Sequence, residues 1–251
     1  MEKVQERRQR RADRLPQCSE CPVRNRTLCR SVPSGRLRSL DKTTLARGEV
    51  LVREDDRFDA VCVVALGVLV GSKMLSDGRR QVIGLFYPGD VIHPTPTRPG
   101  GETADVSVEA ATPAQVCRYG RGELLQLAER HGGLARHLLQ LTERELQHTH
   151  DLMLVLSRAS ARERVAYFLL RLSRRAQERA EPATPIWLPI SRQTIGDHLG
   201  LTMETASRVL SRFRRDGLIQ QAGHAGYVHL RDIAGLQQAA GLHLDHVPGA
   251  A

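Results

Sequence analysis

The sequence predicts an α+β protein with an N-terminal antiparallel β-roll, a long dimerisation helix and a C-terminal winged helix-turn-helix. Short alternating apolar runs extend from about Gly48 to Tyr119, a stripe of helical spacing follows from Ala135, and two short helical patterns flank a glycine after Arg192. These patterns predict a cysteine-bearing segment at residues 1–30, the roll at 31–122 and the long helix at 123–157. The winged domain follows at 158–240 and a tail at 241–251.

Composition narrows the class of protein. The 251 residues contain no run of eighteen apolar residues, and the N-terminal MEKVQERRQRRADR lacks the apolar core of a secretory signal. We therefore expect a cytoplasmic protein without a membrane partner. Because that compartment is reducing, the five cysteines are expected to be metal ligands or sensors rather than disulfides. The net charge of +9 favours a polyanionic partner, although a solvated arginine-rich surface gives the same charge.

Six strand-like segments predict the β-roll. Residues with strand preference fill EVLVR, FDAVCVV, GVLVGSKML, RQVIGLFY, ADVSVEA and AQVCRY, between residues 49 and 119. Asp77-Gly78 is a hairpin signal, and Pro88-Gly89-Asp90 is typical of a turn. Strands at such close spacing predict a small antiparallel barrel or roll.

A helical pattern follows from Glu123 to Leu156, interrupted only by Gly132-Gly133. Residues of one stripe recur there at alternating steps of four and three, which is the spacing of a coiled-coil seam between two copies of the chain. The alternative is one long amphipathic helix that packs on its own domain. Ser160 and Glu163 form a capping-box pattern that starts the next helix. The stripe consists of Ala135, Leu139, Thr142, Leu146, Thr149, Met153 and Leu156.

The segment RQTIGDHLGLTMETASRVL, residues 192–210, has the pattern of a helix-turn-helix. Such a unit needs apolar residues where two short helices pack, a small residue where they cross and a glycine at the turn. Gly196 and Gly200 supply the small residue and the turn, and Thr202 is a good N-cap for the second helix. An ordinary helical hairpin is the alternative. The apolar positions are Ile195, Leu199, Leu201, Ala206 and Val209.

The second helix of this unit carries candidate base-reading residues, Glu204, Ser207 and Arg208, on one face. Arginine can pair with guanine and glutamate can accept from cytosine, so Glu204 and Arg208 predict one or more G·C pairs in each half-site. A surface ion pair between them is the alternative. The segment LIQQAGHAGYVHL after it predicts a β-hairpin wing. Secondary DNA contacts, with the three arginines on phosphates, are expected from Thr202, Ser211, Arg212, Arg214 and Arg215.

Together these parts resemble the CRP–FNR family of bacterial transcription regulators. HLGLTMETASRVLSRFRRDGLI, residues 198–219, is similar to the family's reading helix, and LSRASARERVAYFLLRLSRR, residues 156–175, is similar to the helix that opens its DNA-binding domain. The E-x-x-S-R signature of the FNR branch stands here as Glu204, Ser207 and Arg208. The resemblance implies a homodimer that reads a double-stranded palindrome similar to TTGAT-N4-ATCAA.

Four cysteines are candidate metal ligands. Cys18, Cys21 and Cys29 are spaced C-x2-C-x7-C, and Cys117 ends the last predicted strand. Four thiolates can bind a [4Fe–4S] cluster or zinc, and a metal-free thiol sensor is a third interpretation. The resemblance favours the cluster, since FNR-type members hold an oxygen-labile [4Fe–4S] cluster with three N-terminal cysteines and one in the roll. The spacing resembles that of the FnrL and FnrN-type subgroup.

Single residues and one loop bear on whether the chain binds the other ligands known in this family. Cys62 lies in an apolar strand run and is expected to be a buried core residue. His93 lies where haem sensors of the family use a histidine, so haem is a further interpretation. A cyclic nucleotide is not expected, because PGDVIHPTPTRPGGETADVSVEA lacks the family's Arg-Ser or Arg-Thr pair and its prolines would break the pocket helix.

The resemblance implies an oxygen-responsive regulator that binds DNA as a dimer under low oxygen and regulates anaerobic genes. It also implies contact with RNA polymerase, in part through a loop similar to Ser76–Arg80. The chain departs from better-known FNR members at Thr149, where they carry an aspartate. The alternative is a regulator with structural zinc or another signal. No Gly-rich phosphate loop or nucleophile–base pair has recognisable spacing, so an enzyme is not expected.

Overall fold

The computed structural model describes residues 21–31, 41–93, 103–223 and 226–241. Contacts separate the chain into two compact units, Met1–Glu145 and Leu146–Ala251. Cys18 and almost all of the predicted tail lie outside the described residues. None of the helices in the described ranges combines the length and apolarity that a membrane span requires.

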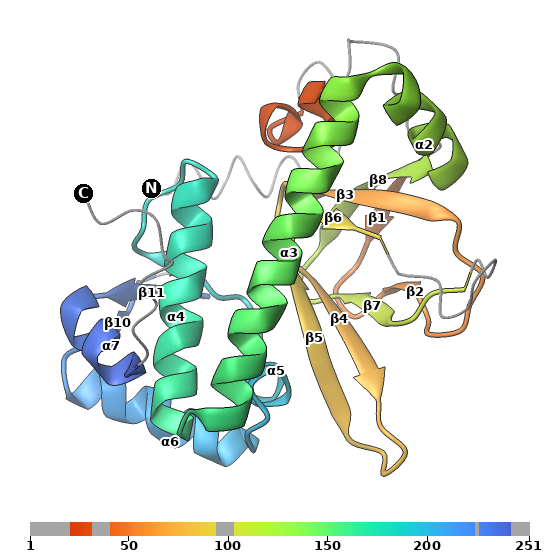
Figure 1. Ribbon diagram of the computed structural model, residues 1–251. Helices are drawn as coiled ribbons and strands as arrows, with labels where there is room; N and C mark the ends of the chain where they lie inside the picture. Colours follow the sequence, from red (N-terminus) through yellow and green to blue (C-terminus); the bar gives the residue numbers. More distant parts are fainter. Residues whose placement is uncertain (1–20, 32–40, 94–102, 224–225, 242–251) are drawn as a thin grey trace. The chain divides into compact units, whose positions relative to one another are not determined.

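The first unit contains two four-stranded antiparallel sheets, with strand orders β1-β8-β3-β6 and β2-β7-β4-β5. Figure 1 colours these strands from orange to light green. The six predicted strands are confirmed, and β1 and β6 were not predicted. The bounds are β1 Asp41–Leu45, β2 Val50–Val52, β3 Ala60–Leu66, β4 Leu69–Met74, β5 Arg80–Phe86, β6 Val91–Ile92, β7 Ser107–Ala110 and β8 Ala114–Gly120.

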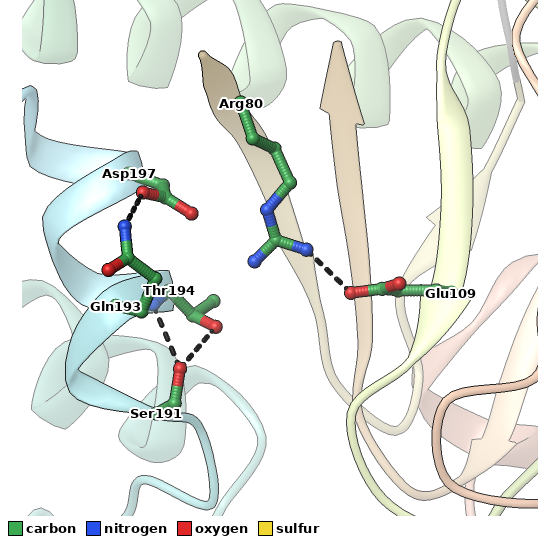
Figure 2. A network of polar contacts seen from close by, with 6 residues as sticks. All are labelled: Arg80, Glu109, Ser191, Gln193, Thr194 and Asp197. Atoms are coloured by element: carbon green, nitrogen blue, oxygen red, sulfur yellow. Dashed lines mark hydrogen bonds and ion pairs between the residues drawn. The ribbon is translucent and has the colours of Figure 1, made fainter. Parts of the chain in front are cut away.

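The predicted Asp77-Gly78 turn connects β4 to β5. Gly78 has a φ of +82°, which a residue with a Cβ seldom adopts, and the Asp77 carboxylate accepts from the Arg79 backbone and side chain. Strands β5 and β7 flank β4, and Arg80 Nη1 donates to Glu109 Oε1 across it at 2.7 Å, as Figure 2 shows. The turn therefore fixes the β4–β5 hairpin, and the side-chain pair connects β5 to β7 across β4.

The sheet β1-β8-β3-β6 is buried on both faces. On β3, Cys62 and Val64 belong to the core inside the roll, whereas Val61 and Val63 belong to a second apolar cluster outside it. This second cluster also takes in Leu124 and Leu134 from the helices that follow the roll. Because both faces are covered, the β3 sequence AVCVVAL is apolar throughout.

The long helix expected at residues 123–157 is in fact two helices, α2 (Arg121–Arg130) and α3 (Gly132–Arg158). The break lies at His131, whose φ of −130° and ψ of 89° are not helical. Gly132 and Gly133 follow immediately, and glycine stabilises a helix less than other residues do, so continuing α2 through this point gains little. The helix α3 still carries the whole predicted stripe.

The second unit is a helical domain with a small sheet. The predicted capping box is confirmed, because Ser160 Oγ accepts from Glu163 N while Glu163 Oε2 accepts from Ser160 N. The predicted wing is confirmed as β10 and β11, which are joined by β9, a strand that was not predicted. The bounds are α4 Ala161–Glu178, β9 Ile186–Trp187, α5 Arg192–Leu199, α6 Met203–Arg215, β10 Ile219–Gln221, β11 Tyr227–Leu230 and α7 Ile233–Ala240.

A histidine on α3 makes the second unit sensitive to acid. Burial, then the nearby Arg171, Arg175 and His198, lower the pKa of His148 from 6.5 to about 3. Above pH 6.5 the ring is neutral in both states. Below it, the unfolded chain takes up a proton that the folded chain rejects, so stability falls by about 1.4 kcal/mol per pH unit.

We therefore expect the free energy of unfolding to fall by about 2 kcal/mol more between pH 7 and pH 5 in the natural chain than in His148→Leu. Urea unfolding at the two pH values measures the difference, and the comparison of the two chains cancels the other titrating groups. Equal acid sensitivity in both chains would show that His148 titrates normally in the folded state.

Candidate nucleic-acid interface and thiol site

The helix-turn-helix predicted at residues 192–210 is present as α5 and α6. A Cβ on Gly196 would lie 2.6 Å from the Leu201 carbonyl oxygen, so only glycine fits where the chain turns against α5. Gly200 ends α5 in the left-handed conformation with a φ of 62°. Ile195, Leu199 and Ala206 are fully buried, as predicted for the surfaces that pack the two helices together.

Side-chain caps define where both helices begin. Ser191 Oγ accepts from Thr194 N at the start of α5 and lies close to the Thr194 hydroxyl, as Figure 2 shows. Thr202 Oγ1 accepts from Thr205 N at the start of α6, which confirms the predicted N-cap. A cap of this kind stabilises a helix by about 1 kcal/mol, and here it fixes the end of α6 that carries Glu204.

The faces of α6 separate packing from exposed chemistry. Ala206, Leu210 and Phe213 are buried in the second unit. Glu204 and Arg208 are exposed, and Ser207 between them is half-buried. Within the described residues Arg208 makes no ion pair with Glu204 and instead donates to Thr205 Oγ1 at 3.3 Å. The alternative of a surface ion pair therefore has no support in this geometry.

Basic residues continue from the end of α6. Arg212, Arg214 and Arg215 are exposed, as is Ser211, and the Nε of Arg212 lies 3.8 Å from Asp216 Oδ2. Arg192, at the start of α5, was not predicted. Burial and then the charge of Arg214 lower the pKa of Arg192, so Arg192 adds to the positive charge around Arg214.

Arg164 connects α4 to the ends of two other helices. It donates through Nε to the Ala159 carbonyl, through Nη1 to the Leu199 carbonyl and through Nη2 to the Leu156 carbonyl, each at 2.9 Å. The last carbonyls of a helix have no partner within that helix, so Arg164 satisfies the ends of α3 and α5 together. It thereby fixes the helix-turn-helix to the end of α3.

Three of the four candidate metal ligands share one place in the first unit. Cys117 is buried on β8, opposite Val63 of β3, in the apolar cluster outside the roll. Half-buried Cys21 and Cys29 pack against the same cluster. We call these three cysteines the thiol site. Cys18 lies outside the described residues, and within them no group of three His, Cys, Asp or Glu side chains is close enough to hold a metal ion.

The surroundings of the thiol site suit thiolate ligands of a metal or cluster. Its neighbours Val23, Leu28, Val61 and Leu134 are apolar and exclude water. The Tyr119 hydroxyl lies among them, 3.3 Å from Cys29 Sγ. A buried hydroxyl in this place matches the demand of bound thiolates for hydrogen bonds.

Cys62 is separated from the thiol site by the sheet itself. It points into the core of the roll, is 0% exposed and has a pKa that burial raises to about 12. A thiol that stays protonated is neither a ligand nor a nucleophile. The prediction that Cys62 is a core residue is confirmed.

The predicted seam lies open on α3. Leu139, Leu146 and Met153 are 58%, 54% and 61% exposed, whereas Leu134 of the same helix is buried against the roll. Thr142 and Thr149 are exposed between them, and Leu156 at the end of the stripe is half-buried. The helix therefore has an apolar stripe in which three large side chains are more than half exposed.

Comparisons with known proteins assign the family. Residues 42–131 match the cyclic nucleotide-binding domain, and residues 163–239 match the Crp-like helix-turn-helix domain. The transcriptional activator protein FnrL of Cereibacter sphaeroides is 33% identical over 235 residues, which cover 90% of this chain and 93% of FnrL. The chain belongs to the CRP–FNR family of transcription regulators. It is a DNA-binding regulator, and its domains are not those of an enzyme.

Other members of the CRP–FNR family agree over nearly the whole chain. The transcriptional activator protein Anr of Pseudomonas aeruginosa is 34% identical over 238 residues, 92% of this chain and 96% of Anr. The structure of FixK2 from Bradyrhizobium japonicum has a TM-score of 0.70 at 35% identity and covers 79% of this chain and 96% of that one. The predicted fold class and family are thus confirmed.

A cavity between the outer face of this CRP–FNR family roll and the helices α2 and α3 is lined in part by the histidine considered for haem. His93, Arg121 and Thr142 contribute polar groups to an otherwise apolar cavity of about 320 Å³ within the first unit. This volume is at the small end of the range for ligand sites. The segment with Pro94, Pro96 and Pro99, on which the argument against a cyclic nucleotide rests, lies outside the described residues. Haem binding at His93 and the expectation that no cyclic nucleotide binds both remain predictions.

Proposed function

We propose that the protein is an oxygen-responsive transcriptional activator that binds a palindromic DNA site as a homodimer. Its oxygen sensor is a [4Fe–4S] cluster on Cys18, Cys21, Cys29 and Cys117. The observation that carries the proposal is the convergence of Cys117 with Cys21 and Cys29 in one apolar cluster, although 87 residues or more separate them in the sequence. The resemblance to FnrL and Anr supports the same interpretation.

The described thiols supply what such a cluster requires. Cysteine thiolates are the usual ligands of a [4Fe–4S] cluster, and the reduction potential of the bound cluster depends on hydrogen bonds to the sulfurs and on solvent exposure. When bound, the cluster would supply an oxygen-sensitive connection between the N-terminal segment and β8. The chain itself keeps water away with the apolar neighbours of the thiol site and holds Cys117 rigidly within a sheet.

The segment that carries Cys29 also contacts the dimerisation helix. The short helix η2 (Leu28–Ser31) contains Cys29 and ends at Ser31, whose Oγ lies 2.7 Å from Nδ1 of His137 on α3. Burial, followed by Arg30 and Arg144, lowers the pKa of His137, which favours the neutral ring. A neutral imidazole nitrogen donates to the hydroxyl or accepts from it, according to its tautomer. Leu28 and Leu134 add an apolar contact between the same two elements. Displacement of η2 would therefore break contacts that it makes with α3.

Ser31→Ala tests this connection. We expect the variant to keep its iron. The ratio of its DNA affinity without oxygen to its DNA affinity with oxygen should fall about fivefold, because the lost hydrogen bond is worth about 1 kcal/mol. Ser157→Ala, which removes a hydroxyl that donates to the Leu154 carbonyl of its own helix, is the matched control. An oxygen response in Ser31→Ala equal to that of the natural chain would exclude this route.

The stripe on α3 is the proposed contact between the two copies. Covering the exposed halves of Leu139, Leu146 and Met153 would contribute about 1 kcal/mol for each side chain. Thr142 and Thr149 weaken the seam, since polar residues at such positions reduce coiled-coil stability. A seam of this composition suits a dimer that forms only when the N-terminal segment supports it.

Thr149→Ile tests the seam. A β-branched apolar residue in the stripe should tighten the dimer in air by about tenfold or more. Sedimentation equilibrium of the aerobic protein measures the change, and Thr44→Ile, on the half-buried strand β1, controls for added hydrophobicity. An unchanged monomer–dimer equilibrium would place the dimer contact elsewhere.

DNA recognition follows from the exposed face of α6. Two copies related by two-fold symmetry would present two such helices to a palindrome similar to TTGAT-N4-ATCAA. Glu204, Ser207 and Arg208 contact its base edges, and Thr202, Ser211, Arg212, Arg214 and Arg215 contact the backbone. Activation requires RNA polymerase, for which the Ser76–Arg80 hairpin is the proposed contact.

Fluorescence anisotropy with a labelled duplex of this sequence tests the function. Protein prepared without oxygen should bind at least about tenfold more tightly than the same protein after exposure to air, because one copy alone makes half the contacts. A duplex with both TTGA elements scrambled is the control. Equal affinity in both conditions would remove oxygen as the signal and leave the DNA-binding function intact.

A further inference from the structure

One side chain of the thiol site is not a candidate ligand. The hydroxyl of Tyr119 lies 3.3 Å from the sulfur of Cys29, a residue ninety positions away. This is within hydrogen-bonding range for sulfur and oxygen, and in the protonated protein either group can donate. The pattern that singled out the four cysteines gives no indication of this tyrosine.

The sheet fixes where this hydroxyl can go. Tyr119 follows Cys117 by two residues on β8, so both side chains leave the same face of the strand. Each has a partner on β3, Val63 opposite Cys117 and Val61 opposite Tyr119. The tyrosine is only 3% exposed. Its ring is thus packed on the roll, and its hydroxyl reaches the N-terminal segment.

Ligand chemistry decides the direction of the hydrogen bond. A cysteine that binds iron is a thiolate and has no proton to donate. Between these two groups the donor is then the phenolic hydroxyl. A donated hydrogen bond stabilises negative charge on the sulfur, and hydrogen bonds to sulfur are one of the factors that set the potential of iron–sulfur clusters. The cluster is accordingly harder to oxidise.

We propose that Tyr119 is a positioning residue that donates a hydrogen bond to the Cys29 thiolate and so slows the oxidation of the bound cluster by dioxygen. This inference rests on the proposed function. In the first step of oxidation one electron passes from the cluster to dioxygen. Tyr119 raises the barrier to this step by stabilising the cluster before it loses the electron. The residue sets the oxygen threshold of the regulator without binding iron itself.

The test compares Tyr119→Phe with the natural chain and with Tyr87→Phe. Phenylalanine keeps the packed ring and removes only the hydroxyl. Tyr87 is 1% exposed in the same roll and does not belong to the apolar cluster of the thiol site, so its variant controls for the loss of a buried hydroxyl. Each protein is prepared without oxygen, its iron and sulfide are counted, and the visible absorbance is followed after mixing with air-saturated buffer. Thermal unfolding of the metal-free proteins monitors the fold.

We expect Tyr119→Phe to lose its absorbance about tenfold faster than the natural chain, while Tyr87→Phe decays at the natural rate. Equal decay of Tyr119→Phe and the natural chain, with iron and sulfide present in both, would overturn the inference and leave the proposed function standing. Faster decay of both variants would also overturn it. Absence of iron and sulfide from the natural chain would instead defeat the proposed function itself.

Discussion

Replacing Cys117 with serine is expected to abolish iron and sulfide binding, from about four of each per chain to nearly none. A serine hydroxyl is not deprotonated at neutral pH and cannot replace a thiolate ligand. Cys117 is buried in the middle of a paired strand, so no other described cysteine can move into its place. Metal analysis of protein prepared without oxygen measures the loss.

The matched control is Cys62→Ala on the neighbouring strand. Cys62 is opposite Arg118 on β8 but faces the core of the roll, so its loss should cost about 1 kcal/mol of stability and no iron. Full iron binding by Cys117→Ser, or loss of iron from Cys62→Ala alone, would show that the ligands are wrongly assigned.

The second large effect concerns base recognition. We expect Arg208→Ala to weaken binding to the TTGAT-N4-ATCAA duplex by about 1–3 kcal/mol for each half-site, or about 2–6 kcal/mol for a dimer. That range corresponds to a loss of about 30-fold to 10⁴-fold. The reason is that exposed Arg208 is free of Glu204 and can reach a guanine edge. Loss of discrimination between G·C and A·T at one position of each half-site should accompany the weaker binding.

Arg215→Ala separates base reading from attraction to phosphate. Arg215 is exposed at the end of α6, where a phosphate contact adds affinity for every sequence. Its removal should weaken specific and scrambled duplexes alike and reduce the salt dependence of binding by about one counterion for each copy. If Arg208→Ala behaved in the same way as Arg215→Ala, Arg208 would be a phosphate contact.

The helix-turn-helix could be predicted from sequence because its determinants are local. Gly196, Gly200 and Thr202 act within a few residues of their own positions, and the structure has each in its expected role. The roll could be predicted only in part. Strand β1, DKTTL, carries a single apolar residue and shows no alternation, and its pairing with β8 is determined by residues about seventy positions away.

Contacts of the thiol site could not be predicted from periodicity. The resemblance to FNR-type proteins, and not the spacing of the cysteines, predicts that Cys117 lies near the N-terminal cysteines. Nothing in the sequence near Tyr119 or His137 indicates that they meet Cys29 and Ser31, because a hydrogen bond across about a hundred residues leaves no local pattern. Gly132-Gly133 interrupt the helical pattern, but the residues on both sides have helical character, so the sequence does not show that α2 and α3 are separate helices.

The proposed oxygen response depends most directly on what the four cysteines bind. Protein purified without oxygen should be brown, with a broad absorption band at the blue end of the visible spectrum and about four irons and four sulfides per chain. Air should remove the band, and Cys117→Ala should lack it from the start. Colourless protein with one zinc per chain would contradict the account, because the thiol site would then be structural and the signal would lie elsewhere.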